Sequence, residues 1–411
     1  MRSADKPRGM GAITETENER GKILRDGRIF IVVVLALYFG SIYLSSFFMP
    51  YDNFWSHLQV QAFPEFDDLL PVTRSCDLMR TGVDPIQTPE NKPGHVIFNY
   101  PRIWLSLRFL GVSEQHTNAI AVVSIAAFFI TALLLIGPVA TSDRLLYTLI
   151  FCSPAVMLGA ARGSTDLIVF VVVGGALLLL RSNIAGGWAY AVLLFAALLK
   201  YFPIFSIALA MRESPRRFWT LMVLFVCVFV FYLWISRDDI RVINQLTPRP
   251  AYLSFGARVI FERWWLRGPD NTACAIALTG LALILGVLLA ARLPQSVSEQ
   301  SGIDTRHLDA FRVGAVIYCG VFALLLNNGI YRMIFVILCL PQMLIWKRQG
   351  GRTGAFAMVA LGCVLLSAWL PRYVRNFWQL DQLSDWLLFI FFVQTIVASA
   401  PKYLKKLVFI R

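Results

Sequence analysis

The sequence predicts an all-α integral membrane protein, a polytopic helical bundle of about eleven or twelve membrane helices. Of the 411 residues, 57% are hydrophobic and only 15% are charged, and the mean hydropathy is +0.63. Soluble domains are nearer half apolar and a quarter charged. Apolar runs recur along the whole chain, as expected when each crossing needs about 20 apolar residues. These observations exclude an ordinary soluble enzyme, a disordered chain and a small disulfide scaffold.

A polar segment of mixed charge, residues 1–28, opens the chain and is predicted to be a cytoplasmic tail. The first apolar run, 29–49, is too long for a signal-peptide core and has no small-residue cleavage site after it, so it is a retained first helix. Residues 29–411 are then a single polytopic membrane domain. Its further apolar runs lie near 117–138, 145–160, 166–180, 185–199, 203–211, 218–235, 272–291, 313–326, 331–346, 354–370 and 385–400.

The basic residues predict the orientation. If the tail lies inside and the runs alternate, the cytoplasmic segments hold 22 of the 38 Lys and Arg residues, and the short basic clusters after residues 211, 346 and 401 all lie inside. This is the positive-inside pattern, and it accounts for the net charge of +13 better than nucleic-acid binding does. Both termini are predicted to be cytoplasmic. Two long loops, 50–116 and 236–271, fall on the outer face.

One pair of apolar runs is interrupted. Runs 185–199 and 203–211 are separated by Lys200-Tyr201-Phe202-Pro203. Broken helices at membrane depth are tolerated only inside protein or beside a water-filled cavity, so the break indicates a cavity. A lysine at this depth marks function by default. The alternative is that the Lys200 side chain extends to the interface.

Motifs for common soluble chemistry are absent from the sequence. It contains no phosphate-binding loop, dinucleotide glycine motif, H-E-x-x-H or G-x-S-x-G. The four histidines lack metal-ligand spacing, and Cys76 is the one cysteine clearly in a polar loop. We therefore expect no metal, no cofactor and no disulfide framework.

Acidic residues near the outer face are the candidate bases. Asp67 and Asp68 are adjacent carboxylates that repel each other, so one of them is expected to have a raised pKa and to suit general-base work. The alternative is a solvated pair that caps a helix. Asp166 begins an apolar run, where a capping role is also open. Arg162 is close enough in sequence to pair with Asp166 or to bind an anion.

Basic residues on the same face are the candidate anion ligands. Arg258 lies in the second outer loop, Arg332 lies between two apolar runs, and both join Lys200 and Arg162. Arginine and lysine are the side chains that bind phosphate. A set of basic groups with one acidic pair on one face predicts a lipid-phosphate substrate and a carboxylate base.

Four short motifs carry a resemblance to a known family. In chain order they are Asp68 followed by Gly82-Val83-Asp84-Pro85, then Phe98-Asn99-Tyr100-Pro101, then Gly163 to Asp166, then Leu199-Lys200-Tyr201-Phe202-Pro203. Together they resemble the GT-C-fold glycosyltransferases, in particular glycosyltransferase family 87, typified by polyprenol-phosphate-mannose-dependent mannosyltransferases. The resemblance covers residues 67–203. The chain departs from the family pattern at Ile86, at Pro101-Arg102 and at Ser164.

The resemblance implies a GT-C-like bundle and a reaction. A sugar, of mannose type, would pass from a polyprenyl-phosphate donor to a hydroxyl of a lipid or glycan acceptor at the outer face of the cell (inner) membrane, with inversion. The implied partners are that donor, the acceptor and membrane lipids, with no nucleic acid and no cofactor. Asp68 would be the base, with Asp67 as the fallback. The phosphate ligands would be Lys200, Arg162, Arg258 and Arg332, and the site would also be lined by Asp84, Tyr100 and Asp166.

Two other readings remain open at this point. A transporter or flippase of a lipid-linked saccharide suits the number of crossings, but it should place ionisable residues near the bilayer centre rather than at one face. An O-antigen-type polymerase or ligase also has many helices, but its arginine-rich loop is expected late in the chain.

Overall fold

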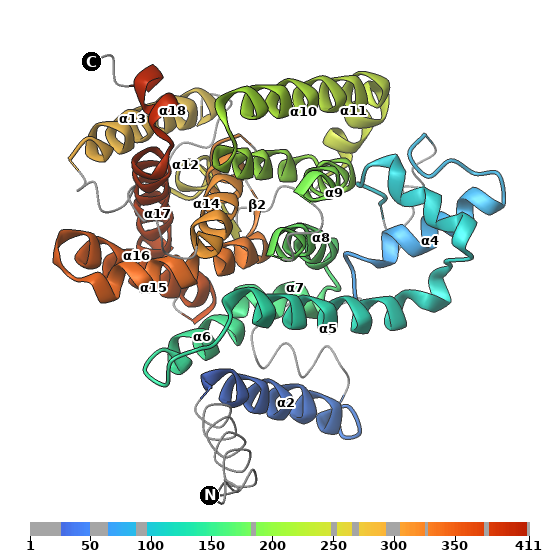
Figure 1. Ribbon diagram of the computed structural model, residues 1–411. Helices are drawn as coiled ribbons and strands as arrows, with labels where there is room; N and C mark the ends of the chain where they lie inside the picture. The colour runs from blue at the N-terminus through green and yellow to red at the C-terminus, as the bar shows by residue number, and fades with distance from the viewer. Residues whose placement is uncertain are drawn as a thin grey trace, which may run out of the picture.

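A computed structural model describes residues 26–49, 65–87, 97–181, 186–247, 253–264, 271–292, 305–324, 328–373 and 378–408. Most of the predicted tail 1–28 and parts of both predicted outer loops lie outside these residues. Apart from the two-residue strands β1 (Ser254–Phe255) and β2 (Asn328–Gly329), the described regular structure is helical (Figure 1).

Eight helical segments in the described part of the chain are long and apolar enough to cross a membrane. A ninth is added if α6 (Arg144–Phe151) and α7 (Pro154–Ala161), which meet at 42°, form one bent span. The predicted polytopic bundle is thereby confirmed. The eight are α2 (Gly27–Ser45), η2 with α5 (Glu114–His116 and Thr117–Ile136), α10 (Pro215–Ile235), α13 (Asn271–Ala290), α14 (Arg306–Leu324), η5 with α15 (Ile330–Cys339 and Leu340–Gln349), α16 (Gly351–Tyr373) and α17 (Trp378–Ser399).

Three apolar runs counted as crossings form shorter helices. They are α8 (Thr165–Arg181, 17 residues), α9 (Gly186–Leu199, 14 residues) and the 3-10 helix η3 (Phe202–Arg212, 11 residues). Hydropathy alone cannot separate a full span from a short helix that is surrounded by protein. Here α8 and α9 pack against each other, α8 packs on α5, and η3 packs on α14. The predicted break at Lys200 is present, between α9 and η3.

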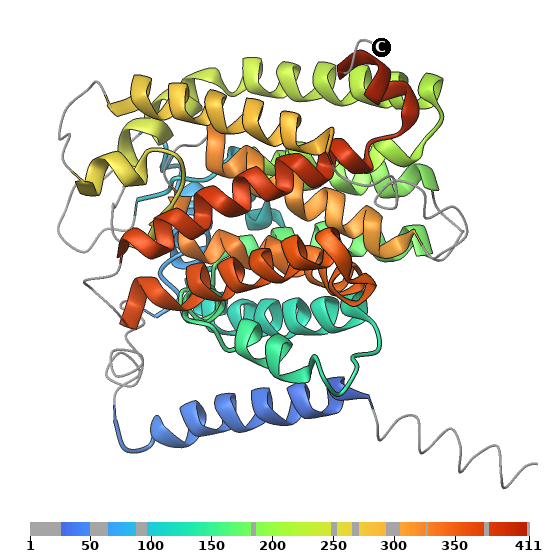
Figure 2. The same ribbon diagram turned by 90° about the vertical axis from the view of Figure 1, so that its left-hand side faces the viewer.

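Different helices lie at the two ends of the bundle. The N-terminal end of α2 and the short helix α18 (Lys402–Val408) lie toward one end (Figures 1 and 2). The helices of the two predicted outer loops, α4 (Leu70–Arg80) and α11 (Arg237–Leu246), lie toward the other end in Figure 1. This arrangement agrees with an even number of crossings between the tail and the C-terminal segment. Which face of the membrane each end meets stays a prediction.

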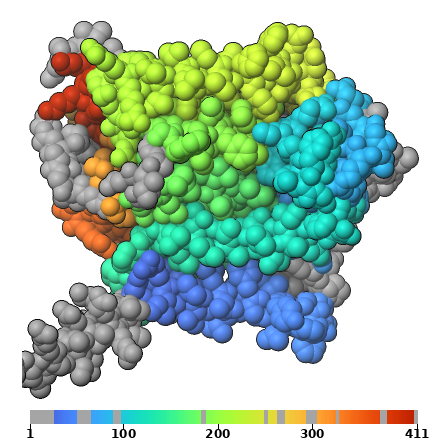
Figure 3. Space-filling model, turned by 45° about the vertical axis from the view of Figure 1, so that its right-hand side comes forward, coloured from blue at the N-terminus to red at the C-terminus, as the bar shows by residue number. Residues whose placement is uncertain are grey.

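Helix α2 forms a ridge along one side of the bundle (Figure 3). It contacts α6, and the rings of Phe39 and Phe129 add a contact to α5. Only Gly27, Ile31 and Leu35 of α2 are buried in the protein. Most of the other side chains of α2 are apolar and are exposed or half-buried, so lipid is the environment that suits this face of the helix.

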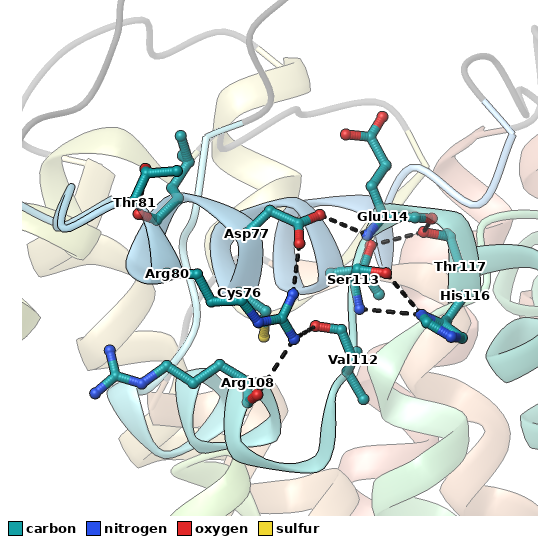
Figure 4. Close-up of polar contacts among 12 residues, drawn as sticks. Cys76, Asp77, Arg80, Thr81, Arg108, Val112, Ser113, Glu114, His116 and Thr117 are labelled. Atoms are coloured by element: carbon teal, nitrogen blue, oxygen red, sulfur yellow. Dashed lines mark hydrogen bonds and ion pairs between the residues drawn. The ribbon is translucent and has the colours of Figure 1, made fainter.

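The segment after α2 is held to the bundle by a polar network (Figure 4). Arg80 at the end of α4 donates to Asp77, to the carbonyl of Arg108 at 3.2 Å and to the carbonyl of Val112. Asp77 in turn accepts from the backbone amide of Glu114 at 2.8 Å. The Arg80 guanidinium thus ties α4 to the end of the 3-10 helix η1 (Arg102–Leu110), where the Arg108 carbonyl also accepts from the Gly111 amide at 3.1 Å.

The packing of α8 on α5 gives a testable prediction. Gly174→Ala is expected to destabilise the protein by about 1–3 kcal/mol, because overpacking a tight contact has this cost. The added Cβ would lie 2.5 Å from Thr131 Cγ2 and 2.9 Å from Leu135 Cδ1. The neighbouring Gly175 has no such atoms within 4 Å, so Gly175→Ala is the matched control. Thermal unfolding of both variants in nanodiscs measures the difference, and equal midpoints would contradict this close approach of α5 and α8.

Candidate functional site

A short segment of the first outer loop lies directly on the turn between α7 and α8. Two residues make the approach possible by adopting positive φ: Phe66 at 53° and Gly163 at 55°. The backbone amide of Asp68 donates to the carbonyl of Arg162 at 3.0 Å. A Cβ on Gly163 would lie 3.0 Å from the Cβ of Phe66, so only glycine leaves room for this contact. The consequence is that Asp67 and Asp68 lie beside the Arg162 side chain.

Arg162 binds both carboxylates. Its Nε and Nη2 donate to Asp68 Oδ1 at 2.9 and 2.8 Å, and its Nη2 also donates to Asp67 Oδ2 at 2.6 Å. The other oxygen of Asp68, Oδ2, is buried and accepts no hydrogen bond from the described residues. The sequence left Arg162 to pair with Asp166 or an anion, and the structure pairs it with Asp67 and Asp68 instead. Arg162 therefore holds one oxygen of Asp68 and leaves the second available.

The two carboxylates differ in environment. Asp68 is the more buried, with 8% of its side chain exposed against 26% for Asp67. Burial raises the pKa of Asp67, the nearby Asp68 carboxylate raises it further, and the charge and hydrogen bond of Arg162 oppose the rise. The pKa of Asp67 is thus raised chiefly by burial, and the repulsion between adjacent acids adds to the rise.

A second group of charges surrounds Asp166 in the first turn of α8. Asp166 is fully buried, and its Oδ1 accepts a hydrogen bond from Lys200 Nζ at 2.6 Å. Arg332 Nε lies 3.4 Å from Asp166 Oδ2. The Asp166 carboxylate therefore pairs with Lys200 and Arg332, which is a role beyond the helix cap that the sequence left open. The Lys200 amine does not reach the interface, because it is buried at the break between α9 and η3 and paired there.

Two tyrosines join these groups. Tyr100 donates from Oη to the carbonyl of Asp68 at 2.7 Å, and Lys200 Nζ lies 5.4 Å from the centre of its ring. Tyr331 interacts electrostatically with Asp68, Asp166, Arg162 and Arg332. Tyr331 was missed by the sequence reasoning, although it directly precedes Arg332. Tyr100 and Tyr331 thus link the six charged side chains into one site, which we call the charged cluster: Asp67, Asp68, Arg162, Asp166, Lys200 and Arg332.

Arg332 is positioned from the second outer loop. Strand β1 pairs antiparallel with β2, with Ser254 opposite Gly329 and Phe255 opposite Asn328. Asn328 then accepts a hydrogen bond from Arg332. The ring of Tyr331 lies over Gly329, where a Cβ would be 2.5 Å from its Cε1. The two short strands therefore fix the residues that precede Arg332.

The last two sequence candidates lie on neighbouring segments. Arg258 follows β1, where Ala257 donates from its amide to the carbonyl of Phe322 at 3.0 Å. Asp84 pairs with Arg102 at 2.8 Å. Partial burial by itself raises the pKa of Asp84, but hydrogen bonds from Arg102 and from the Ile86 amide bring the pKa below its usual value. Asp84 therefore helps to hold the Arg102 guanidinium, and Arg102 joins the two predicted outer loops through its ion pair with Asp239.

The turn at Gly163 gives a further prediction. Gly163→Ala is expected to lower the stability by more than the roughly 1–2 kcal/mol that left-handed backbone costs an alanine. The surplus comes from the contact with Phe66. Gly111 is in the left-handed region, with φ 79° and ψ 4°, and has no atoms within 4 Å of an added Cβ, so Gly111→Ala measures the backbone cost alone. Chemical or thermal unfolding in nanodiscs gives both values. If Gly111→Ala is as damaging as Gly163→Ala, the contact with Phe66 contributes nothing.

The charged cluster brings three carboxylates and three cations together from elements far apart in the sequence. Within the described ranges, no three His, Cys, Asp or Glu side chains are placed to hold a metal ion. Comparisons of the chain with protein-family models, with curated proteins and with solved structures find no match.

Proposed function

We propose that this protein is a membrane glycosyltransferase that moves a sugar from a polyprenyl-phosphate donor to a hydroxyl of a lipid or glycan acceptor at the outer face of the cell membrane. One observation carries the proposal. Asp68 is a buried carboxylate with one oxygen held by Arg162 and the other without a hydrogen-bond partner among the described residues. Next to it, Lys200 and Arg332 share a single carboxylate, Asp166.

The proposed chemistry assigns Asp68 as the general base. The acceptor hydroxyl gives its proton to Oδ2 of Asp68 while its oxygen attacks the anomeric carbon on the side opposite the phosphate. The bond from the anomeric carbon to the phosphate oxygen breaks, and its electron pair leaves with the phosphate. The products are the inverted glycoside and the free polyprenyl phosphate. Arg162 keeps Oδ1 of Asp68 fixed, so Oδ2, which accepts the proton, has one orientation.

The leaving phosphate is assigned to Lys200 and Arg332. These two cations face one carboxylate, so their side of the charged cluster carries one excess positive charge. A fixed cation beside the developing phosphate charge stabilises the transition state, because it needs no reorganisation during the reaction. Arg162 is less suited to this role than the sequence suggested, since its Nε and Nη2 already donate to Asp67 and Asp68.

The two alternative functions would give different products. A flippase would move the lipid-linked sugar without breaking its glycosidic bond. A polymerase or ligase would consume a diphosphate-linked glycan. Both differ from the proposal in the product that appears, so product analysis separates all three.

The test uses the purified full chain in nanodiscs with radiolabelled sugars on synthetic polyprenyl phosphates and membrane-lipid acceptors. We expect radiolabel in an acceptor product and release of polyprenyl phosphate in equal amount. Product formed only from polyprenyl diphosphate-linked glycans would favour the polymerase or ligase. Movement of intact donor across proteoliposomes without any product would favour the flippase.

A further inference from the structure

Tyr201 has an unusual position beside the charged cluster. It follows Lys200 at the break between α9 and η3, and its ring faces α10, with centroid distances of 6.3 Å to both Phe229 and Tyr232. Its hydroxyl oxygen is buried and makes no hydrogen bond within the described part of the chain. A buried hydroxyl without a partner costs free energy, so a group that is not part of this chain is expected to satisfy it.

An ion pair at the start of α11 interacts electrostatically with this hydroxyl. Arg102 donates from Nε to Asp239 Oδ2 at 2.7 Å and from Nη2 to Asp239 Oδ1 at 2.8 Å. Asp239 is in the first turn of α11, which directly follows α10, and its side chain is 14% exposed. The Tyr201 phenol interacts electrostatically with Asp239, yet no hydrogen bond joins them. The phenol and the carboxylate therefore interact at a distance, and neither is hydrogen-bonded to the other.

The segments around Tyr201 and Asp239 are joined by hydrogen bonds from η1. Trp104 of η1 donates from Nε1 to the carbonyl of Leu199 at 2.9 Å, which ties η1 to the last residue of α9. Arg102, at the start of η1, reaches α11 and also binds Asp84 at 2.8 Å. The first predicted outer loop, the break at Lys200 and the start of α11 are thus tied to one another next to Tyr201.

The mixture of side chains around Tyr201 points to the class of ligand. Aromatic faces accept the apolar faces of sugar rings, while a phenol, a carboxylate and a guanidinium supply donors and acceptors for hydroxyl groups. A ligand hydroxyl between Tyr201 and Asp239 could accept a hydrogen bond from the phenol and donate one to the carboxylate. The ion pair between Arg102 and Asp239 could stay in place. A lipid tail would leave the phenol unsatisfied.

We propose that Tyr201, Tyr232, Asp239 and Arg102 form a saccharide subsite that binds a sugar ring of the acceptor, next to Lys200 in the charged cluster. The assignment of this sugar to the acceptor rests on the proposed glycosyl transfer. Binding of a saccharide at Tyr201 does not depend on glycosyl transfer, because it is inferred from the phenol, the carboxylate and the aromatic faces alone.

Direct binding tests the subsite without any reaction. The probes are octyl β-glucoside, octyl β-galactoside and octyl α-mannoside, each below its critical micelle concentration, with the full chain in nanodiscs and saturation-transfer NMR as the readout. For at least one probe, we expect saturation of the sugar-ring protons in the wild type and at least a threefold loss in Tyr201→Phe. The alkyl protons report partition into the membrane and should not change. Tyr43→Phe, at a phenol that is 66% exposed on α2, is the matched control.

Two binding results would overturn the subsite. One is saturation confined to alkyl protons in the wild type for all three probes. The other is equal ring saturation in the wild type and Tyr201→Phe, which would mean that water alone meets the phenol. Tyr201→Phe keeps the ring, and unchanged thermal unfolding confirms that the fold is intact.

Kinetics separate the subsite from the proposed function. In the transfer assay, Tyr201→Phe is expected to raise the KM for the acceptor by roughly three- to tenfold, the effect of one neutral hydrogen bond, and to leave the KM for the donor unchanged. Transfer with an unaltered acceptor KM would reject the acceptor assignment and keep the glycosyltransferase. Ring saturation that depends on Tyr201, without transfer from any donor, would keep the saccharide subsite and reject the glycosyltransferase.

Discussion

Replacing Asp68 by Asn is expected to lower sugar transfer by about 10²–10⁴-fold, the usual contribution of a positioned general base. The amide has nearly the shape of the carboxylate and can still accept from Arg162, but it cannot take the proton of the acceptor. The measurement is the initial rate with saturating donor and acceptor. Donor binding, followed separately, should change much less than the rate.

Asp67→Asn is the matched control for this experiment. Asp67 is more exposed and binds Arg162 through Nη2 alone, and Arg162 keeps both of its bonds to Asp68 when Asp67 is neutral. A modest loss of rate is expected. If Asp67→Asn abolishes transfer and Asp68→Asn does not, the base is Asp67, as the sequence left open. If both variants keep full activity, neither carboxylate is the base.

Replacing Lys200 by Met is expected to destabilise the protein by about 3–5 kcal/mol, the cost of removing one partner of a buried ion pair. Asp166 has no exposed surface, so its charge cannot be solvated when Lys200 is lost. Arg332, at 3.4 Å, compensates in part and places the expected value toward the lower end of this range. Thermal and chemical unfolding in nanodiscs gives the difference.

The double variant Lys200→Met/Asp166→Asn separates stability from function. Neutralising Asp166 removes the uncompensated charge, so most of the lost stability should return. Transfer should stay low, because the cation that faces the leaving phosphate is still missing. Full recovery of transfer in the double variant would mean that Lys200 serves only to neutralise Asp166. Wild-type stability in Lys200→Met alone would contradict the buried pair.

Hydropathy predicted the bundle because every long apolar run must avoid water, whatever surrounds it. The break at Lys200 was also predictable, since a lysine and a proline interrupt one apolar stretch. The lengths of α8, α9 and η3 were harder to interpret, because protein and lipid are equally apolar neighbours for such short helices. In the described residues eight or nine segments are long enough to cross a membrane, against the eleven or twelve predicted, and these three short helices account for the difference.

The pairing within the site depended on contacts that sequence does not display. Arg162 is four residues from Asp166, which suggested a local pair, but the turn at Gly163 brings Asp67 and Asp68 to Arg162 from about 95 residues away. Tyr331 was overlooked because a tyrosine in an apolar run is normally interpreted as a residue of the hydrophobic core. Its place in the site follows from the two-residue pairing of β1 with β2, which is too short to leave a sequence pattern.

The charged cluster also has a direction. Asp67, Asp68 and Arg162 carry one excess negative charge, and Asp166, Lys200 and Arg332 carry one excess positive charge. The folded chain therefore maintains an internal electric field between these two groups before any substrate arrives. In the proposed reaction the proton moves toward the negative group and the electron pair moves toward the positive one. The same field favours both displacements, and it needs no rearrangement of the protein when the transition state forms.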